Sequence, residues 1–213
     1  MHFKALFVCL FSLTALVLST TAHAVILYAK GDGGSSSSFR QGPIGMALGV
    51  DPSTPRNGIA VNPHQRDTTI FKQGLMGSWY GCGQTKQSGF LNVIRLTLAL
   101  VAKGEIAKVS PGGFLFMVLH QINGNGNGPY VCGIDKTGRG TKFSPLTVTR
   151  QVPGKSPTPN AVKTKRFPLQ VAIPSDLKCL GQYEDMKNIC MIRCQNKSFN
   201  GPYGACIPVQ LVA

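Results

Sequence analysis

The chain has 213 residues, with 22 lysines and arginines against 8 aspartates and glutamates, and a formal net charge of +14. A chain of this length can bury the core of a single domain. The basic residues are not interleaved with aromatic residues, which argues against a nucleic-acid-binding protein. A solvated basic face is the simplest interpretation, and attraction to anionic wall polymers or to a membrane surface is the alternative.

The N-terminal residues have the pattern of a secretory signal peptide. Lys4 precedes an apolar run over residues 5–18, and small residues follow over 19–24. The apolar run is too short to span a membrane. We therefore predict that residues 1–22 are a signal peptide and that the protein is secreted.

Two cleavage points compete at the end of this segment. A cut after Ala22 leaves His23 as the first residue, whereas a cut after Ala24 leaves Val25 first. We predict the first cut, so that residues 23–213 form one secreted domain without a transmembrane segment.

The pattern of the remaining residues predicts short strands separated by loops rich in glycine and proline. Residues 31–38 predict a flexible loop, residues 42–63 a long ordered loop, and the apolar spacing within residues 90–102 predicts one helix. Strands are predicted at residues 25–29, 114–119, 130–132, 147–152, 167–173 and 207–212. This pattern predicts a mainly β fold, an antiparallel β-sandwich of the immunoglobulin-like or fibronectin-like kind with long loops.

One ionisable side chain, His120, follows the apolar run, where we expect the strand to leave the core. The glycine–asparagine tract over residues 123–129 then predicts a turn into a returning strand that begins at Tyr130. The glycine spacing resembles a phosphate loop only weakly, because no helix-opening pattern follows it. The asparagine spacing resembles the start of a calcium loop, but the tract contains no carboxylate.

The cysteines predict a disulfide framework. Cys9 leaves with the signal peptide, and an even set remains in the secreted chain, as expected for three disulfides. These residues are Cys82, Cys132, Cys179, Cys190, Cys194 and Cys206. Their pairing cannot be derived from the sequence. The motif Asn196-Lys197-Ser198 predicts glycosylation of Asn196 on an exposed loop.

Several segments together resemble the appressorium-associated virulence-factor family of plant-pathogenic fungi, known from powdery mildew and blast fungi. In chain order they include Gly45-Met46-Ala47-Leu48-Gly49-Val50-Asp51, Thr54-Pro55-Arg56-Asn57-Gly58, Asn62-Pro63-His64-Gln65-Arg66-Asp67-Thr68, Leu119-His120-Gln121-Ile122-Asn123, Gly128-Pro129-Tyr130-Val131-Cys132, Cys190-Met191-Ile192-Arg193-Cys194 and Gly201-Pro202-Tyr203-Gly204-Ala205-Cys206. The resemblance implies a secreted protein linked to host penetration, without a settled biochemical activity.

No hydrolase site is apparent in the sequence, which has neither a Gly-x-Ser-x-Gly elbow nor a credible pair of carboxylates. If cleavage exposes His23, its terminal amine and imidazole can chelate a metal, and the imidazole of His120 would complete a three-nitrogen site suited to copper. Tyr203 or Tyr130 would then take the axial position. This arrangement resembles the histidine brace of the lytic polysaccharide monooxygenases.

The competing interpretation is that His23 leaves with the signal peptide and that His120 only ends a strand. His64, in a proline-rich loop, is interpreted as a structural hydrogen-bonding residue. A different class of function is a non-catalytic protein that contacts cell-wall polysaccharide or a host surface component. In that case Tyr28, Trp79, Tyr80 and Tyr130 either stack on sugar rings or pack in the core.

Overall fold

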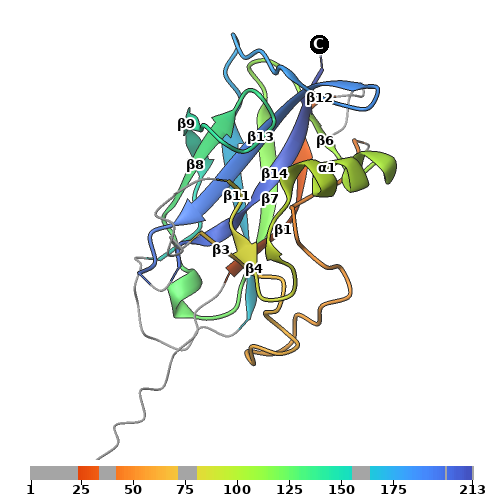
Figure 1. The fold of residues 1–213 in the computed structure, drawn as a ribbon. Helices are drawn as coiled ribbons and strands as arrows, with labels where there is room; N and C mark the ends of the chain where they lie inside the picture. Colours follow the sequence, from red (N-terminus) through yellow and green to blue (C-terminus); the bar gives the residue numbers. More distant parts are fainter. Residues whose placement is uncertain (1–23, 34–41, 72–80, 155–163, 200, 213) are drawn as a thin grey trace, which may run out of the picture.

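The computed structural model describes residues 24–33, 42–71, 81–154, 164–199 and 201–212. They form two sheets that face each other, and one α-helix, α1 (Val93–Ala102), beside them (Figure 1). Among these residues, all strand pairs are antiparallel except one short parallel pair in the second sheet. The predicted mainly β, sandwich-like fold with one helix is therefore confirmed. The finer immunoglobulin-like or fibronectin-like topology is not confirmed, because the strand orders do not by themselves identify it.

The first sheet, sheet A, is built around β7 (Phe114–Gln121). On one side β7 pairs with β1 (Ala24–Gly31), and on the other with β11 (Lys165–Ala172). Two short strands, β2 (Gly45–Met46) and β10 (Val148–Arg150), complete the edges of this sheet. The predicted strands at residues 25–29, 114–119 and 167–173 lie in these elements. The strand β7 continues through His120, so that residue lies within the sheet and not beyond its end.

The second sheet, sheet B, is built around the long strands β13 (Met186–Asn196) and β14 (Tyr203–Leu211). The strand β8 (Tyr130–Asp135) pairs with β13. The remaining strands of this sheet are β3 (Thr69–Ile70), β4 (Gln84–Thr85), β5 (Gly89–Phe90), β6 (Ala107–Val109), β9 (Ser144–Leu146) and β12 (Gly181–Tyr183).

The glycine–asparagine tract does not form a hairpin. It contains a short 3-10 helix, η1 (Gly124–Gly126), and carries the chain from β7 in sheet A to β8 in sheet B. The strand after the tract begins at Tyr130 as predicted, and it pairs with β13 of sheet B and not with β7. Tyr130 and Cys132 then contribute to the core between the sheets.

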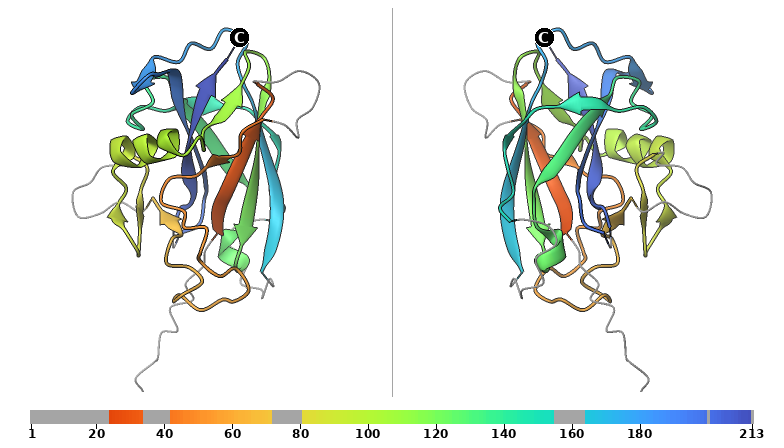
Figure 2. Two further views of the ribbon diagram at one scale, coloured as in Figure 1. Left: turned by 90° about the vertical axis from the view of Figure 1, so that its right-hand side faces the viewer. Right: turned by 90° about the vertical axis from the view of Figure 1, so that its left-hand side faces the viewer.

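The core lies between the two sheets. Sheet A contributes Ile26, Leu115, Met117, Leu119 and Leu169, and sheet B contributes side chains at alternate positions of β8, β13 and β14. On the other side of sheet B, α1 packs through Val93, Leu96 and Leu100 against a second apolar cluster that includes Met191 and Cys206 (Figure 2). The Asn92 side chain caps α1 by accepting a hydrogen bond from the Arg95 N–H at 3.0 Å.

The six cysteines form three disulfides, as the sequence predicted, with the pairs Cys82–Cys206, Cys132–Cys194 and Cys179–Cys190. The second pair joins directly opposite residues of β8 and β13. The first ties the loop before β4 to β14, so the C-terminal strands are stapled to the body of the domain. No helix among the described residues is long and apolar enough to cross a membrane.

We expect the three disulfides to contribute unequally to stability, because the entropy that a crosslink removes from the unfolded chain grows with loop length. The sequence separations are 124 residues for Cys82–Cys206, 62 for Cys132–Cys194 and 11 for Cys179–Cys190, which correspond to about 5, 4 and 3 kcal/mol in the chain-entropy model. Urea unfolding of the three double Cys→Ala variants should reproduce this order. An order that places Cys179–Cys190 first would contradict the expectation.

Candidate functional site

His120 lies on the outer face of sheet A. Its neighbour Leu119 belongs to the core and pairs with Ile26 and Phe167, whereas His120 pairs with Val25 and Arg166. Because side chains alternate along a strand, His120 points away from sheet B. It is nevertheless only 4% exposed, and neither ring nitrogen has a hydrogen-bond partner in the part of the chain that the structure describes.

The surroundings of His120 keep its imidazole neutral. Burial lowers the pKa of His120 to about 4, the positive charges of Arg56 and Arg166 act in the same direction, and Asp67 opposes them. At neutral pH the ring therefore carries one N–H and one lone pair. A buried neutral imidazole without partners is chemically ready to bind a metal ion or to exchange hydrogen bonds with a ligand.

A buried ion pair between Arg56 and Asp67 anchors the long loop near His120. The two terminal nitrogens of the Arg56 guanidinium, Nη1 and Nη2, donate to the two carboxylate oxygens of Asp67. The distance from Nη1 to Oδ1 is 2.8 Å. The backbone N–H of Asp51 also donates to Asp67, at 2.9 Å. Asp67 is fully buried, so these hydrogen bonds replace the water that its charge has lost.

Asp51 forms a second, more exposed centre in the same loop. Its carboxylate accepts hydrogen bonds from the Ser53 hydroxyl and backbone N–H, from Gln87 and from Arg66, and these hold the pKa of Asp51 well below its usual range. The hydrogen bonds of Asp51 and Asp67 thus explain why this loop is ordered, as the sequence predicted. Sequence reasoning missed both roles, although two aspartates and two arginines within one short segment of an acid-poor chain were an available signal.

A network of side-chain amides fixes the turns at the same end of the sheets. Gln121 donates to the carbonyl of Asn123 at 2.9 Å and to the side-chain oxygen of Asn127. The amide nitrogen of Asn196 donates to the carbonyls of Asn125 and Asn127, at 2.8 and 3.1 Å. The Asn196 oxygen accepts from the N–H of Tyr203 at 3.0 Å. The glycine–asparagine tract is thus held by protein groups.

The location of Asn196 corrects an expectation from the sequence. Asn196 is the last residue of β13 and is only 1% exposed, so it does not lie on an exposed loop. The amide nitrogen that would carry a glycan is the one that donates to Asn125 and Asn127. Glycosylation of Asn196 remains untested, but this fold does not favour it.

The two tyrosines proposed as axial ligands lie on a different side of the sheets from His120. Tyr130 belongs to the core, and its hydroxyl donates to the carbonyl of Gly126 at 3.1 Å. Tyr203 shares its side of β14 with Ala205 and Ile207, which also face the core. Burial raises the pKa of Tyr203 to about 12 and that of Tyr130 still further. The structure does not bring either hydroxyl to the outer face of sheet A.

His23, Trp79 and Tyr80 lie outside the described residues. His64 has the structural role that we predicted, because its Nδ1 lies 3.2 Å from the carbonyl of Pro55 and its ring packs against Gly58. Within the described ranges, no three His, Cys, Asp or Glu side chains come together as a metal site. Any metal at His120 therefore needs donors from elsewhere.

These observations define a disulfide-stapled antiparallel β protein with an end built from loops that buried polar groups hold in place. A model of the Egh16-like virulence factor family matches residues 21–204. The chain belongs to this family, and the resemblance found in the sequence is confirmed.

Two relatives come from the blast fungus Pyricularia oryzae. The chain is 34% identical over 209 residues to the appressoria-specific virulence factor GAS1, and the match covers 94% of the chain and 79% of GAS1. It is 28% identical over 161 residues to the appressoria-specific virulence factor GAS2, a match that covers 74% of the chain and 53% of GAS2. The matched region therefore spans about half of GAS2. No solved structure matches the chain.

We expect Arg56→Gln to destabilise the fold by about 3–5 kcal/mol, because it leaves the charge of Asp67 buried without its partner. The matched control is Arg66→Gln, which breaks the ion pair with the more exposed Asp51 and should cost less than about 1 kcal/mol. Urea unfolding at neutral pH measures both values. Equal losses in the two variants would show that the buried pair does not hold the loop.

His120 should make the stability of the metal-free protein depend on pH. Its pKa is about 4 in the folded state against an ordinary value of 6.5, so the unfolded chain binds the proton more tightly. The contribution is fully present above pH 6.5 and is lost as the pH falls toward 4, by on the order of 3 kcal/mol. The difference in unfolding free energy between the parent protein and His120→Gln, followed from pH 7 to pH 4, isolates this contribution. A constant difference would contradict it.

Proposed function

We propose that this protein is secreted and acts in host penetration from an appressorium. The observation that carries the proposal is the similarity to GAS1, which extends over 94% of the chain. Three disulfides suit an oxidising extracellular compartment, and the N-terminal pattern suits export. The basic surface suits contact with anionic cell-wall polysaccharide or with a host surface component.

Deletion of the gene in the source organism should lower the number of successful penetrations of intact host surfaces, while appressoria form in normal numbers. Wounding the host should remove the defect, because a wound bypasses penetration. Counting both stages under the microscope, with reintroduced wild-type gene as the control, tests the role. Penetration of intact tissue at the wild-type rate would refute it.

A second candidate function is copper binding through a histidine brace. It is favoured by one observation, the buried neutral imidazole of His120 whose two nitrogens lack partners among the described residues. Position 23 directly precedes Ala24, which pairs with Gln121 beside His120. Val25 pairs with His120 in the register of β1 and β7, so these two residues lie on the same outer face of sheet A.

In this proposal the terminal amine and imidazole of His23 and the imidazole of His120 hold the metal, without Tyr203 or Tyr130. Bound copper would supply one-electron redox chemistry, as it does in the monooxygenases with this brace. Burial, together with the positive charges of Arg56 and Arg166, lowers the pKa of His120, so its ring keeps a lone pair for the metal at neutral pH.

Protein beginning at His23 should bind copper(II) in calorimetric titration, and His120→Ala should weaken binding by orders of magnitude. Affinity should fall between about pH 8 and pH 6, where the amine and His23 take up protons, since His120 itself is protonated only near pH 4. His64→Ala is the matched control, because His64 already bonds to Pro55. Unchanged affinity in His120→Ala, or a mature protein that begins at Val25, would rule out the brace.

A further inference from the structure

A cleft of about 790 Å³ lies beside α1, away from His120. One wall is formed by Ile94 and Leu98 of α1. The opposite wall is the turn over residues 137–141, which follows β8, and the remaining wall comprises Leu180, β12 and Glu184. The cleft is large enough for several residues of an extended peptide.

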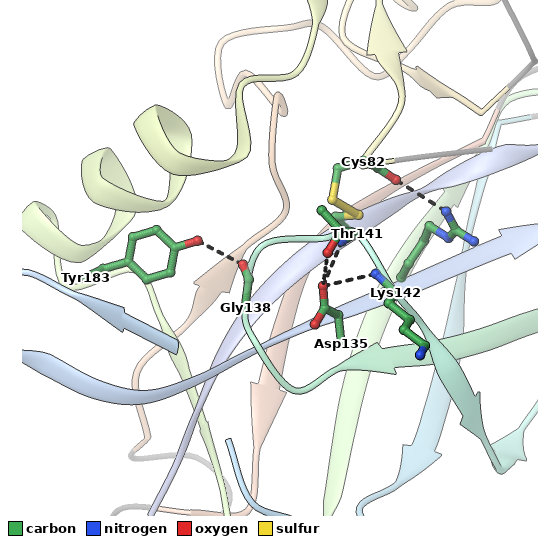
Figure 3. The surroundings of a disulfide bond; sticks show 9 residues. Cys82, Asp135, Gly138, Thr141, Lys142 and Tyr183 are labelled. Carbon is green, nitrogen blue, oxygen red and sulfur yellow. Dashed lines mark hydrogen bonds between the residues drawn. A yellow bond between two sulfur atoms is a disulfide. The ribbon is translucent and has the colours of Figure 1, made fainter. Parts of the chain in front are cut away.

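The walls are held in place without a ligand. The carboxylate of Asp135 accepts a hydrogen bond from the N–H of Thr137 at 2.8 Å. It also accepts hydrogen bonds from the N–H groups of Thr141 at 2.7 Å and Lys142 at 3.3 Å (Figure 3). The hydroxyl of Tyr183 donates to the carbonyl of Gly138 at 2.8 Å and so joins the turn to β12. A pre-formed cleft binds without the entropic cost of ordering its walls.

The lining of the cleft combines aliphatic and charged side chains with the polar side chains of Thr137, Thr141 and Gln182. Ile94 and Leu180 are 56% and 73% exposed, which leaves apolar surface in contact with water. Arg139 and Glu184, also exposed, come from different walls. Among the described residues, neither of these two side chains forms an ion pair. The aromatic ring in the lining, Tyr183, is only 6% exposed.

Glu184 is held in an unfavourable backbone conformation. Its φ is +52°, in the left-handed region that glycine adopts without strain and that costs other residues about 1–2 kcal/mol. A glycine at this turn would avoid that cost but would remove the carboxylate from the edge of the cleft. A strained residue that carries a charge at the edge of a cleft is a candidate for a binding role.

We propose that this cleft binds an extended segment of a partner protein. In that segment an aliphatic side chain rests on Ile94, Leu98 and Leu180, between an acidic group at Arg139 and a basic group at Glu184. Sugar rings are usually bound by stacking on exposed aromatic faces, which the lining of this cleft does not offer. Aliphatic surface between opposite charges suits a peptide, for which the charges set the direction of binding. The inference goes beyond the proposed role in penetration and does not require it.

The probe is an array of synthetic nonapeptides in a glycine–serine background, each with one aspartate, one leucine and one lysine in varied order and spacing. The purified protein should prefer one charge order. Because the charges are exposed, Arg139→Gln and Glu184→Gln should each weaken the best peptide by about threefold. Leu180→Ser should weaken it by about tenfold, since it removes apolar contact. Lys136→Gln, which directly precedes this turn and lies outside the lining, is the matched control.

Charge reversal provides the sharpest test. The double variant Arg139→Glu with Glu184→Lys should bind preferentially the peptides with the opposite charge order. Glu184→Gly should weaken binding about threefold while the protein unfolds at an equal or higher temperature, because the strain is relieved. These opposite effects separate a binding residue from a structural one.

The proposal fails if the parent protein shows no preference for charge order, or if the double variant keeps the parent's preference. It also fails if an array of cell-wall oligosaccharides, rather than the peptides, is bound in a way that Leu180→Ser abolishes. All of these measurements use purified protein, so their outcome is independent of the penetration assay on the deletion strain.

Discussion

One end of the molecule depends on the hydrogen bonds of the Asn196 side-chain amide. Its nitrogen holds the two carbonyls of Asn125 and Asn127 on the segment that crosses from sheet A to sheet B, and its oxygen holds the N–H of Tyr203 at the start of β14. Asn196, the last residue of β13, thus holds two segments that contain the same Gly-Pro-Tyr sequence, Gly128-Pro129-Tyr130 and Gly201-Pro202-Tyr203. The Asn196 oxygen also accepts a hydrogen bond from the Ser198 N–H at 3.3 Å. An apolar side chain would remove all four of these hydrogen bonds, and each buried backbone group left unsatisfied costs about 1–3 kcal/mol.

The same principle explains the long loop before β3. Regular strands satisfy their backbone groups through neighbouring strands, but a buried loop needs side chains for that purpose. Asp67 and Asp51 supply the acceptors, and Arg56 and Arg66 balance their charge. These four residues lie in the segments that carry the resemblance to the Egh16-like family. The contacts of these residues shape the loop that brings Arg56 and Asp67 near His120.

The features that depend on local sequence were predictable, and those that depend on long-range pairing were not. The apolar run before His120 identified β7, and the helical spacing identified α1, because each signal lies within one element. The face of sheet A on which His120 lies could not be predicted, because the sequence does not show that its neighbour Leu119 faces the core. The strand β13 was missed because Lys187, Asn188, Arg193 and Gln195 interrupt its apolar residues, although Cys190, Ile192 and Cys194 alternate as in a strand. The glycosylation motif alone predicted an exposed loop at Asn196, because the sequence does not show the hydrogen bonds to Asn125, Asn127 and Tyr203 that bury this side chain.

The two candidate surfaces use opposite sides of one core. His120 lies on the outer face of sheet A, whereas the peptide cleft lies beside α1, which covers the outer face of sheet B (Figure 2). Substitutions at exposed residues such as Arg139, Glu184 and Leu180 remove no buried contact of sheet A, so they should leave the surroundings of His120 intact. A metal at one surface and a partner protein at the other would therefore bind without sharing side chains. The separation means that substitutions at the cleft and at His120 test the two proposals independently of each other.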